Sequence, residues 1–95
     1  MLGYKSTSIP SNADLNDYVT VGCYRTTSAA IAATITNTPF SQAYVLWYIS
    51  PYSGKSDIEK YGKQIAFSGT SPTIKVRQNT NGNWGPWKTI SFEDE

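Results

Sequence analysis

The chain has 95 residues, a formal net charge of +1 and 16% charged residues. This length fits one domain, and such a charge lacks the basic stripe of a nucleic-acid-binding surface. With one cysteine and no histidine, the chain has no internal disulfide and none of the Ser-His or Cys-His pairs of nucleophilic enzymes. No apolar run approaches the roughly 20 residues of a membrane span. We therefore expect neither nucleic acid nor a membrane as a partner.

The N-terminal part divides into a polar segment and a strand. Residues 1–12 are polar and contain a proline, which favours a linker or an N-terminal arm of an excised domain, without a signal peptide. Residues 18–25 alternate β-branched or apolar residues with others, and this period of two predicts a strand. Cys23 lies in this strand, where we expect it to be buried as a small apolar side chain.

An alanine-rich stretch then predicts one short helix of about two turns. Ser28 is suited to be its N-cap, and Ile31 and Ile35 lie four residues apart on one helical face. Asn37 and Pro39 are suited to end it. A strand is the competing interpretation, because threonine and isoleucine are frequent here. A helix this short is marginal in water, so its isoleucine face must pack on a sheet.

The second half of the chain predicts further strands. Residues 44–49 are apolar without a break, which predicts a central strand covered on both faces. Asn81-Gly82 predicts a hairpin, because a type I′ turn requires positive φ at both central residues. The other predicted segments are a charged loop within residues 50–62, strands near 63–68 and 73–78, and a return strand at 87–92.

These elements predict an α+β fold, with a small, mainly antiparallel sheet of four to five strands and one short helix packed on one face. The domain is expected to span residues 13–92, and residues 93–95 form an acidic end.

Several short motifs occur in an order that resembles the pyocin-knob type of domain, found in tail fibres and receptor-binding proteins of phages and prophages. The first half has "NADLN", Gly-x-Tyr in "GCY", and "SAA" followed by a proline; the second has "KQIAF" and "IKVRQNTNGNWGPWKTI". The resemblance covers residues 12–91. The connection "SPYSGKSDIEKYG" is longer and more charged than the family's pattern, which makes it a candidate for a chain-specific surface feature.

The resemblance implies a non-enzymatic structural or receptor-binding module of a phage or prophage tail fibre that contributes to host-surface attachment. Its place would be the extracellular virion, and its partners would be other domains of a trimeric parent fibre and a bacterial cell-surface glycan. It brings no catalytic residue and no cofactor. The alternative function is a carbohydrate-binding module of a secreted or cell-surface bacterial protein. A small hydrolase is not expected, and without a heptad repeat the isolated domain is expected to be a monomer.

Five residues are candidate glycan contacts: Trp84, Arg77, Tyr52, Tyr61 and Tyr48. An aromatic face stacks on the apolar C–H face of a sugar, and the planar guanidinium binds a carboxylate or phosphate.

Structural roles compete with these assignments. Trp87 is expected to bury its ring and donate its indole N–H to a backbone acceptor, and Trp84 is divided between core and surface. Arg77 is favoured to stack on an aromatic neighbour or to pair with a carboxylate. Gln64 and Gln78 are expected to make local hydrogen bonds. No metal site is expected, since Asp14 and Asp17 are better explained as turn or cap residues than as calcium ligands.

Overall fold

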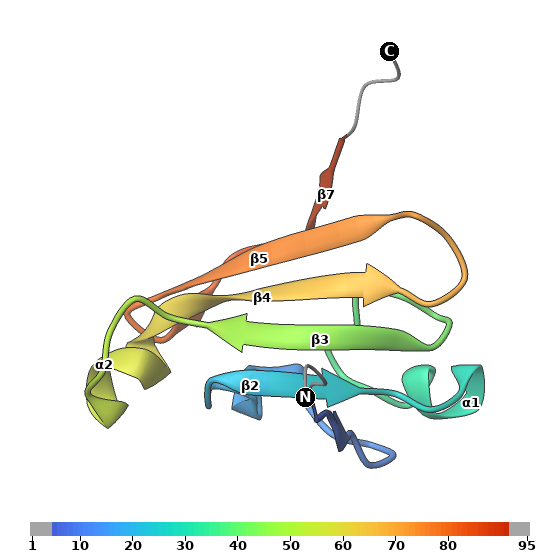
Figure 1. Cartoon of the computed structure of the whole chain (residues 1–95), viewed down its shortest axis with the longest axis horizontal. Helices are drawn as coiled ribbons and strands as arrows, with labels where there is room; N and C mark the ends of the chain where they lie inside the picture. The colour runs from blue at the N-terminus through green and yellow to red at the C-terminus, as the bar shows by residue number, and fades with distance from the viewer. Residues whose placement is uncertain (1–4, 92–95) are drawn as a thin grey trace.

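A computed structural model describes residues 5–91 and shows a seven-stranded sheet with two short α-helices in that part of the chain (Figure 1). The strand order is β1-β2-β3-β4-β5-β6, and β7 also pairs with β5. Only the β1–β2 pair is parallel among the described strands. The elements are β1 (Thr7–Ser8), the 3-10 helix η1 (Leu15–Asp17), β2 (Gly22–Arg25), α1 (Ala29–Ala32), β3 (Tyr44–Ile49), α2 (Lys55–Lys60), β4 (Tyr61–Ser68), β5 (Ile74–Thr80), β6 (Asn83–Trp84) and β7 (Lys88–Ile90).

The mainly antiparallel sheet is confirmed, but the predicted strand count is too low. The two additional strands, β1 and β6, have two residues each, whereas β7 lies within the return strand predicted at 87–92. The Asn81-Gly82 turn is confirmed, with φ of 53° and 83° at its two central residues. Strands of two residues carry too little alternation to be recognised in the sequence.

The predicted first helix exists but is shorter than expected. The side chain of Ser28 accepts a hydrogen bond from the Ile31 N–H at 3.2 Å, as an N-cap should. The helix ends at Ala32, so Ile35 is buried in the segment that follows and not on the helix itself. Asn37 has a φ of 64° beyond the helix end.

Helix α2 corrects the prediction of a loop in residues 50–62. Its N-cap is Gly54, which has no side chain that could accept a hydrogen bond, so side-chain capping does not explain why this helix forms. Its last carbonyl groups are satisfied from elsewhere in the chain. Three donors supply these bonds: Tyr48 Oη to the Ile58 carbonyl, Asn79 Nδ2 to the Glu59 carbonyl at 2.9 Å, and Gly82 N to the Lys60 carbonyl at 3.1 Å. These partners lie on β3, on β5 and in the following turn, so the fold itself holds the helix in place.

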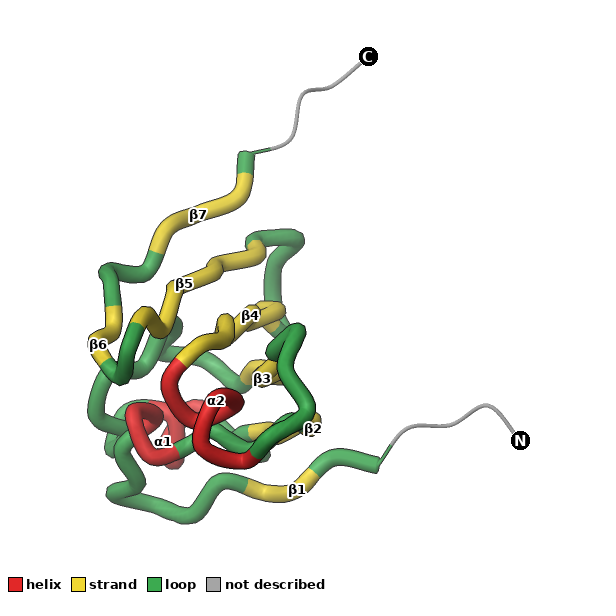
Figure 2. Tube along the Cα trace, turned by 90° about the vertical axis from the view of Figure 1, so that its left-hand side faces the viewer, coloured by secondary structure: helices red, strands yellow, loops and turns green. Residues whose placement is uncertain are grey.

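One face of the sheet is covered by the N-terminal half of the chain. The core contains Tyr44, Leu46 and Ala66 from the sheet, packed against Ile9, Leu15, Ala32 and Ile35. In residues 5–12, which are predicted to be part of a linker or N-terminal arm, Ile9 is 1% exposed and β1 pairs with β2 at the edge of the sheet. Figure 2 shows β1 and β7 at opposite edges of the sheet. The predicted acidic end at residues 93–95 lies outside the described residues.

The other face of the sheet, here called the open face, is only partly buried. In β3 the side chains alternate between buried and partly exposed, and Ile49 is 41% exposed. The prediction that this strand is covered on both faces is therefore wrong. In β5 the predicted alternation is confirmed, but Arg77 is on the covered face and is 5% exposed, whereas Ile74 and Val76 are on the open face.

Candidate functional site

The guanidinium of Arg77 lies over the rings of both Trp84 and Trp87. Its guanidinium carbon is 4.1 Å from the ring centroid of Trp84 and 5.0 Å from that of Trp87. Its Nε donates to Gln64 Oε1 at 2.9 Å. Burial lowers the pKa of Arg77 to about 10, an effect that the negative charge of Asp14 partly offsets. The expected stacking of Arg77 on an aromatic neighbour is confirmed.

The two tryptophans therefore have structural contacts. Trp87 packs against the core and donates its indole N–H to the Asn37 carbonyl at 2.8 Å, as predicted. Trp84 is half-buried, and its ring meets that of Tyr48 edge-on with centroids 6.2 Å apart. Arg77 and Tyr48 are 5% and 0% exposed, so the assignment of these two residues as surface glycan contacts is corrected. For Arg77, alternation along the strand does not indicate which face the rest of the chain covers, whereas Tyr48 lies in the apolar segment 44–49, which the sequence itself predicts to be buried.

The polar side chains beside this cluster also serve the fold. Gln64 Nε2 donates to the Leu15 carbonyl at 2.6 Å and to the Tyr18 carbonyl at 3.1 Å, so its hydrogen bonds are structural but connect segments distant in the sequence, not local ones as predicted. Asp14 caps η1, with Oδ1 accepting from the Asn16 N–H at 3.0 Å. This bond and one from the Asn37 side chain lower the pKa of Asp14. Among the described residues, no group of three or more His, Cys, Asp or Glu side chains could hold a metal ion.

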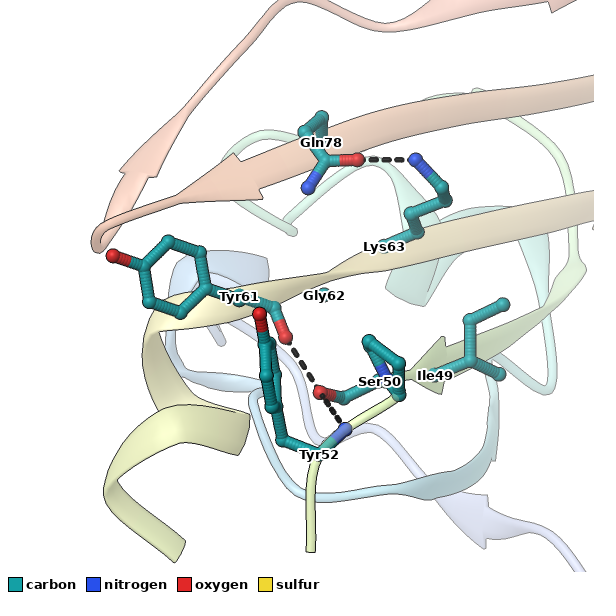
Figure 3. Close-up of a pocket in the computed structure, with 8 residues that line it drawn as sticks. Ile49, Ser50, Tyr52, Tyr61, Gly62, Lys63 and Gln78 are labelled. Atoms are coloured by element: carbon teal, nitrogen blue, oxygen red, sulfur yellow. Dashed lines mark hydrogen bonds between the residues drawn. The ribbon is translucent and has the colours of Figure 1, made fainter. Parts of the chain in front are cut away.

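Tyr52 and Tyr61 come together at the rim of a pocket of about 560 Å³ (Figure 3). Their ring centroids are 5.7 Å apart and the ring planes are inclined by 59°. Tyr52 is 49% exposed and Tyr61 is half-buried. The pocket lies where β3 ends and β4 begins, and Ile49, Ser50, Lys63 and Gln78 also line it. Of the five predicted glycan contacts, the structure brings together these two on an accessible surface.

Ser50 fixes the two tyrosines relative to each other. Its hydroxyl donates to the Tyr61 carbonyl at 2.6 Å and accepts from the Tyr52 N–H at 3.3 Å. Tyr61 directly follows α2, whose last carbonyl groups accept hydrogen bonds from β3, from β5 and from the Asn81-Gly82 turn. Behind the pocket, a Cβ added at Gly62 would lie 2.6 Å from the Ile49 carbonyl oxygen. Only glycine permits the close approach of these two strands at this point. The backbone that carries the tyrosines is therefore fixed by contacts on both sides.

A lysine and a glutamine form the opposite side of the pocket, as Figure 3 shows. Lys63 Nζ donates to Gln78 Oε1, and Gln78 Nε2 donates to the Asn79 carbonyl at 2.9 Å. The local role predicted for Gln78 is confirmed. Lys63 is not among the predicted site residues, although its position two residues after Tyr61 in the same strand places both side chains on one face. The pocket thus combines two aromatic rings with an ammonium group and an amide, which suits a polar ligand that has an apolar face.

No protein-family model and no curated protein sequence matches the chain. None of the described helices is long and apolar enough to cross a membrane.

Solved structures do match. The C-terminal part of the R2 pyocin fibre of P. aeruginosa has a TM-score of 0.79 and 20% identity, over 97% of this chain and 23% of that chain. The corresponding part of the R1 pyocin fibre has a TM-score of 0.77 and 19% identity, over 96% of this chain and 23% of that chain. An N-truncated R2-type pyocin tail fibre gives a TM-score of 0.79 at 20% identity, over 97% of this chain and 34% of that chain. The chain therefore spans less than half the length of the fibres that it matches, and it has the pyocin-fibre type of fold that the sequence resemblance implied.

Proposed function

We propose that this chain is a non-enzymatic domain of a phage or prophage tail fibre that contributes to host attachment by contacting a bacterial cell-surface glycan. Its fold supports the fibre assignment, because the matching structures are pyocin fibres. The chain corresponds to 23% of each of the two longer fibres, so other domains of a trimeric parent fibre are its proposed partners. Its proposed place is the extracellular virion or a prophage-encoded particle.

The pairing of Tyr52 and Tyr61 at an accessible pocket carries the proposal of glycan contact. Two rings inclined by 59° at a centroid distance of 5.7 Å offer an apolar surface that is only partly buried. The C–H face of a sugar packs against such a surface while its hydroxyl groups stay hydrated or bond to polar neighbours. Lys63 and Gln78 are suitable neighbours across the pocket.

The same pocket is compatible with a carbohydrate-binding module of a secreted or cell-surface bacterial protein. The two functions differ in the parent protein, since a fibre domain requires a trimeric parent. Light scattering on the longer parent protein separates them: a trimer favours the fibre, and a monomer favours the free-standing module.

Amide NMR of the isotopically labelled chain, titrated with bacterial cell-wall polysaccharides and simple sugars, tests the glycan contact. We expect shifts to centre on Tyr52, Tyr61 and Lys63, with the indole signals of Trp84 and Trp87 unchanged. Tyr52→Ala should abolish the shifts, and Tyr52→Phe should retain them because the ring remains. Phe67→Ala removes a 38% exposed ring elsewhere on the sheet and serves as the matched control. The absence of shifts with every sugar at millimolar concentration contradicts the proposal.

A further inference from the structure

A second pocket adjoins the pocket lined by Tyr52 and Tyr61, called here the tyrosine pocket, on the open face of the sheet. Its volume is about 300 Å³, and its lining includes Lys63, Gln78, Pro86 and Lys88. Lys63 and Gln78 line both pockets. The two hollows therefore meet at these two residues and form one elongated surface. We call this surface the β4–β7 groove and define it by Tyr52, Tyr61, Lys63, Gln78, Pro86 and Lys88.

The strand register places the two lysines of the groove on the same face. Lys63 on β4 is paired with Gln78 on β5, and Lys88 on β7 is paired with Val76 on β5. Paired residues on neighbouring strands project to the same side, and alternate residues of one strand do so as well. Since β5 lies between β4 and β7, and the partners of the two lysines are two residues apart on β5, the two Cα atoms are separated by roughly 10 Å across the sheet and roughly 7 Å along it, or roughly 12 Å in all.

The groove carries positive charge that no carboxylate of the described chain neutralises. Within residues 5–91 the one side-chain ion pair is Lys55–Glu59, and no aspartate or glutamate lines either pocket. Lys63 donates to Gln78, but an ammonium group has three N–H donors, so donors remain for a ligand. Lys88 is exposed. A concave surface lined by charges of one sign attracts ligands of the opposite sign.

We propose that the β4–β7 groove binds an elongated anionic glycan, a chain of sugar or polyol units that carries carboxylate or phosphate groups. One unit packs against Tyr52 and Tyr61, and the anionic groups meet Lys63 and Lys88. This inference rests on the proposed glycan contact of the tyrosine pocket. Beyond that contact, it specifies that the ligand is negatively charged and that the binding site reaches Lys88 on β7.

Calorimetric titration of the chain with four probes tests the inference. Oligogalacturonate carries carboxylates, poly(glycerol phosphate) carries phosphates, a maltooligosaccharide is neutral, and polyglutamate is a polyanion without sugar. We expect at least one of the first two to bind more tightly than the other probes, with an affinity that falls as salt rises. Lys63→Gln and Lys88→Gln should each weaken this binding about fivefold. Lys5→Gln makes the same change in net charge next to β1, at the opposite edge of the sheet, and should leave the affinity unchanged.

The outcomes separate this inference from the function on which it rests. Preference for oligogalacturonate or for poly(glycerol phosphate) identifies the anionic group, and either preference supports the inference. Equal binding of the neutral probe, with no effect of the two lysine variants, overturns the anionic ligand and leaves the glycan contact standing. Polyglutamate binding that matches the glycans and is insensitive to Tyr52→Ala also overturns it. If no glycan binds, both proposals fail.

Discussion

The guanidinium carbon of Arg77 lies 4.1 Å from the ring centroid of Trp84, and this buried cation–π contact ties β5 to the hairpin strand β6. Arg77 is 5% exposed. A desolvated contact of this kind contributes about 1 to 2 kcal/mol, more than an exposed one. The ring of Trp84, a candidate sugar contact from the sequence, is therefore stacked against a side chain of the protein itself.

A double-mutant cycle measures this contact. We expect Arg77→Met and Trp84→Leu to show a coupling energy of about 1 kcal/mol in urea unfolding, because each change removes one partner while keeping an apolar side chain. The control cycle pairs Trp84→Leu with Lys75→Met, whose ammonium lies over Phe40 and not over a tryptophan. Its two changes should be additive. Equal coupling in the two cycles would show that Arg77 and Trp84 do not stabilise each other directly.

Helix α2 depends on hydrogen bonds from the sheet. Tyr48 Oη donates to the Ile58 carbonyl, so Tyr48→Phe leaves that carbonyl without this donor and keeps the ring in place. We expect a loss of about 1 to 2 kcal/mol in the free energy of unfolding. Amide exchange should also become faster in α2 than in the central strands. Tyr52→Phe removes a hydroxyl from a 49% exposed ring and should leave both quantities unchanged. Unchanged exchange in α2 of Tyr48→Phe would mean that the helix is held by other contacts.

Gly62 allows β4 to approach the end of β3 closely. An added Cβ would meet the Tyr48 side chain and lie 2.6 Å from the Ile49 carbonyl oxygen. Because a backbone atom cannot yield as a flexible side chain can, Gly62→Ala should cost about 3 kcal/mol in urea unfolding. Gly85→Ala is the matched control, since its Cβ would have its nearest contact at 3.7 Å. A small effect at Gly62, similar to that at Gly85, would argue against the close packing behind the tyrosine pocket.

The sequence predicts those features whose cause is local. The Asn81-Gly82 turn follows from the positive φ that asparagine and glycine tolerate, and the role of Ser28 follows from N-cap chemistry. Helix α2 could not be predicted, because its carbonyl partners Tyr48 and Asn79 are brought to it by the sheet.

The candidate site shows the same limit. Tyr52 and Tyr61 were identified by their residue type, but their proximity depends on the hydroxyl of Ser50 and on α2 between them. Arg77 was placed correctly opposite Ile74 and Val76, yet alternation alone does not say which side of a strand the rest of the chain will cover. A polar residue on the covered face requires partners from distant segments, here Gln64 and Trp84.

Asp14 links stability to pH at the acidic end of the range. The N–H of Asn16 and then the side-chain amide of Asn37 bond to its carboxylate and lower its pKa below the usual value of an aspartate. A carboxyl group whose pKa is lower in the folded state stabilises the fold fully above its unfolded pKa, and this contribution disappears as pH falls through the folded pKa. We expect the free energy of unfolding to decrease below about pH 4.

Asp14→Asn retains a capping oxygen and no longer titrates, so part of this decrease should be absent in urea unfolding at a series of pH values. An identical acid slope in the variant would assign the pH dependence to other carboxyl groups, and a large loss at neutral pH would mean that the negative charge itself stabilises this segment.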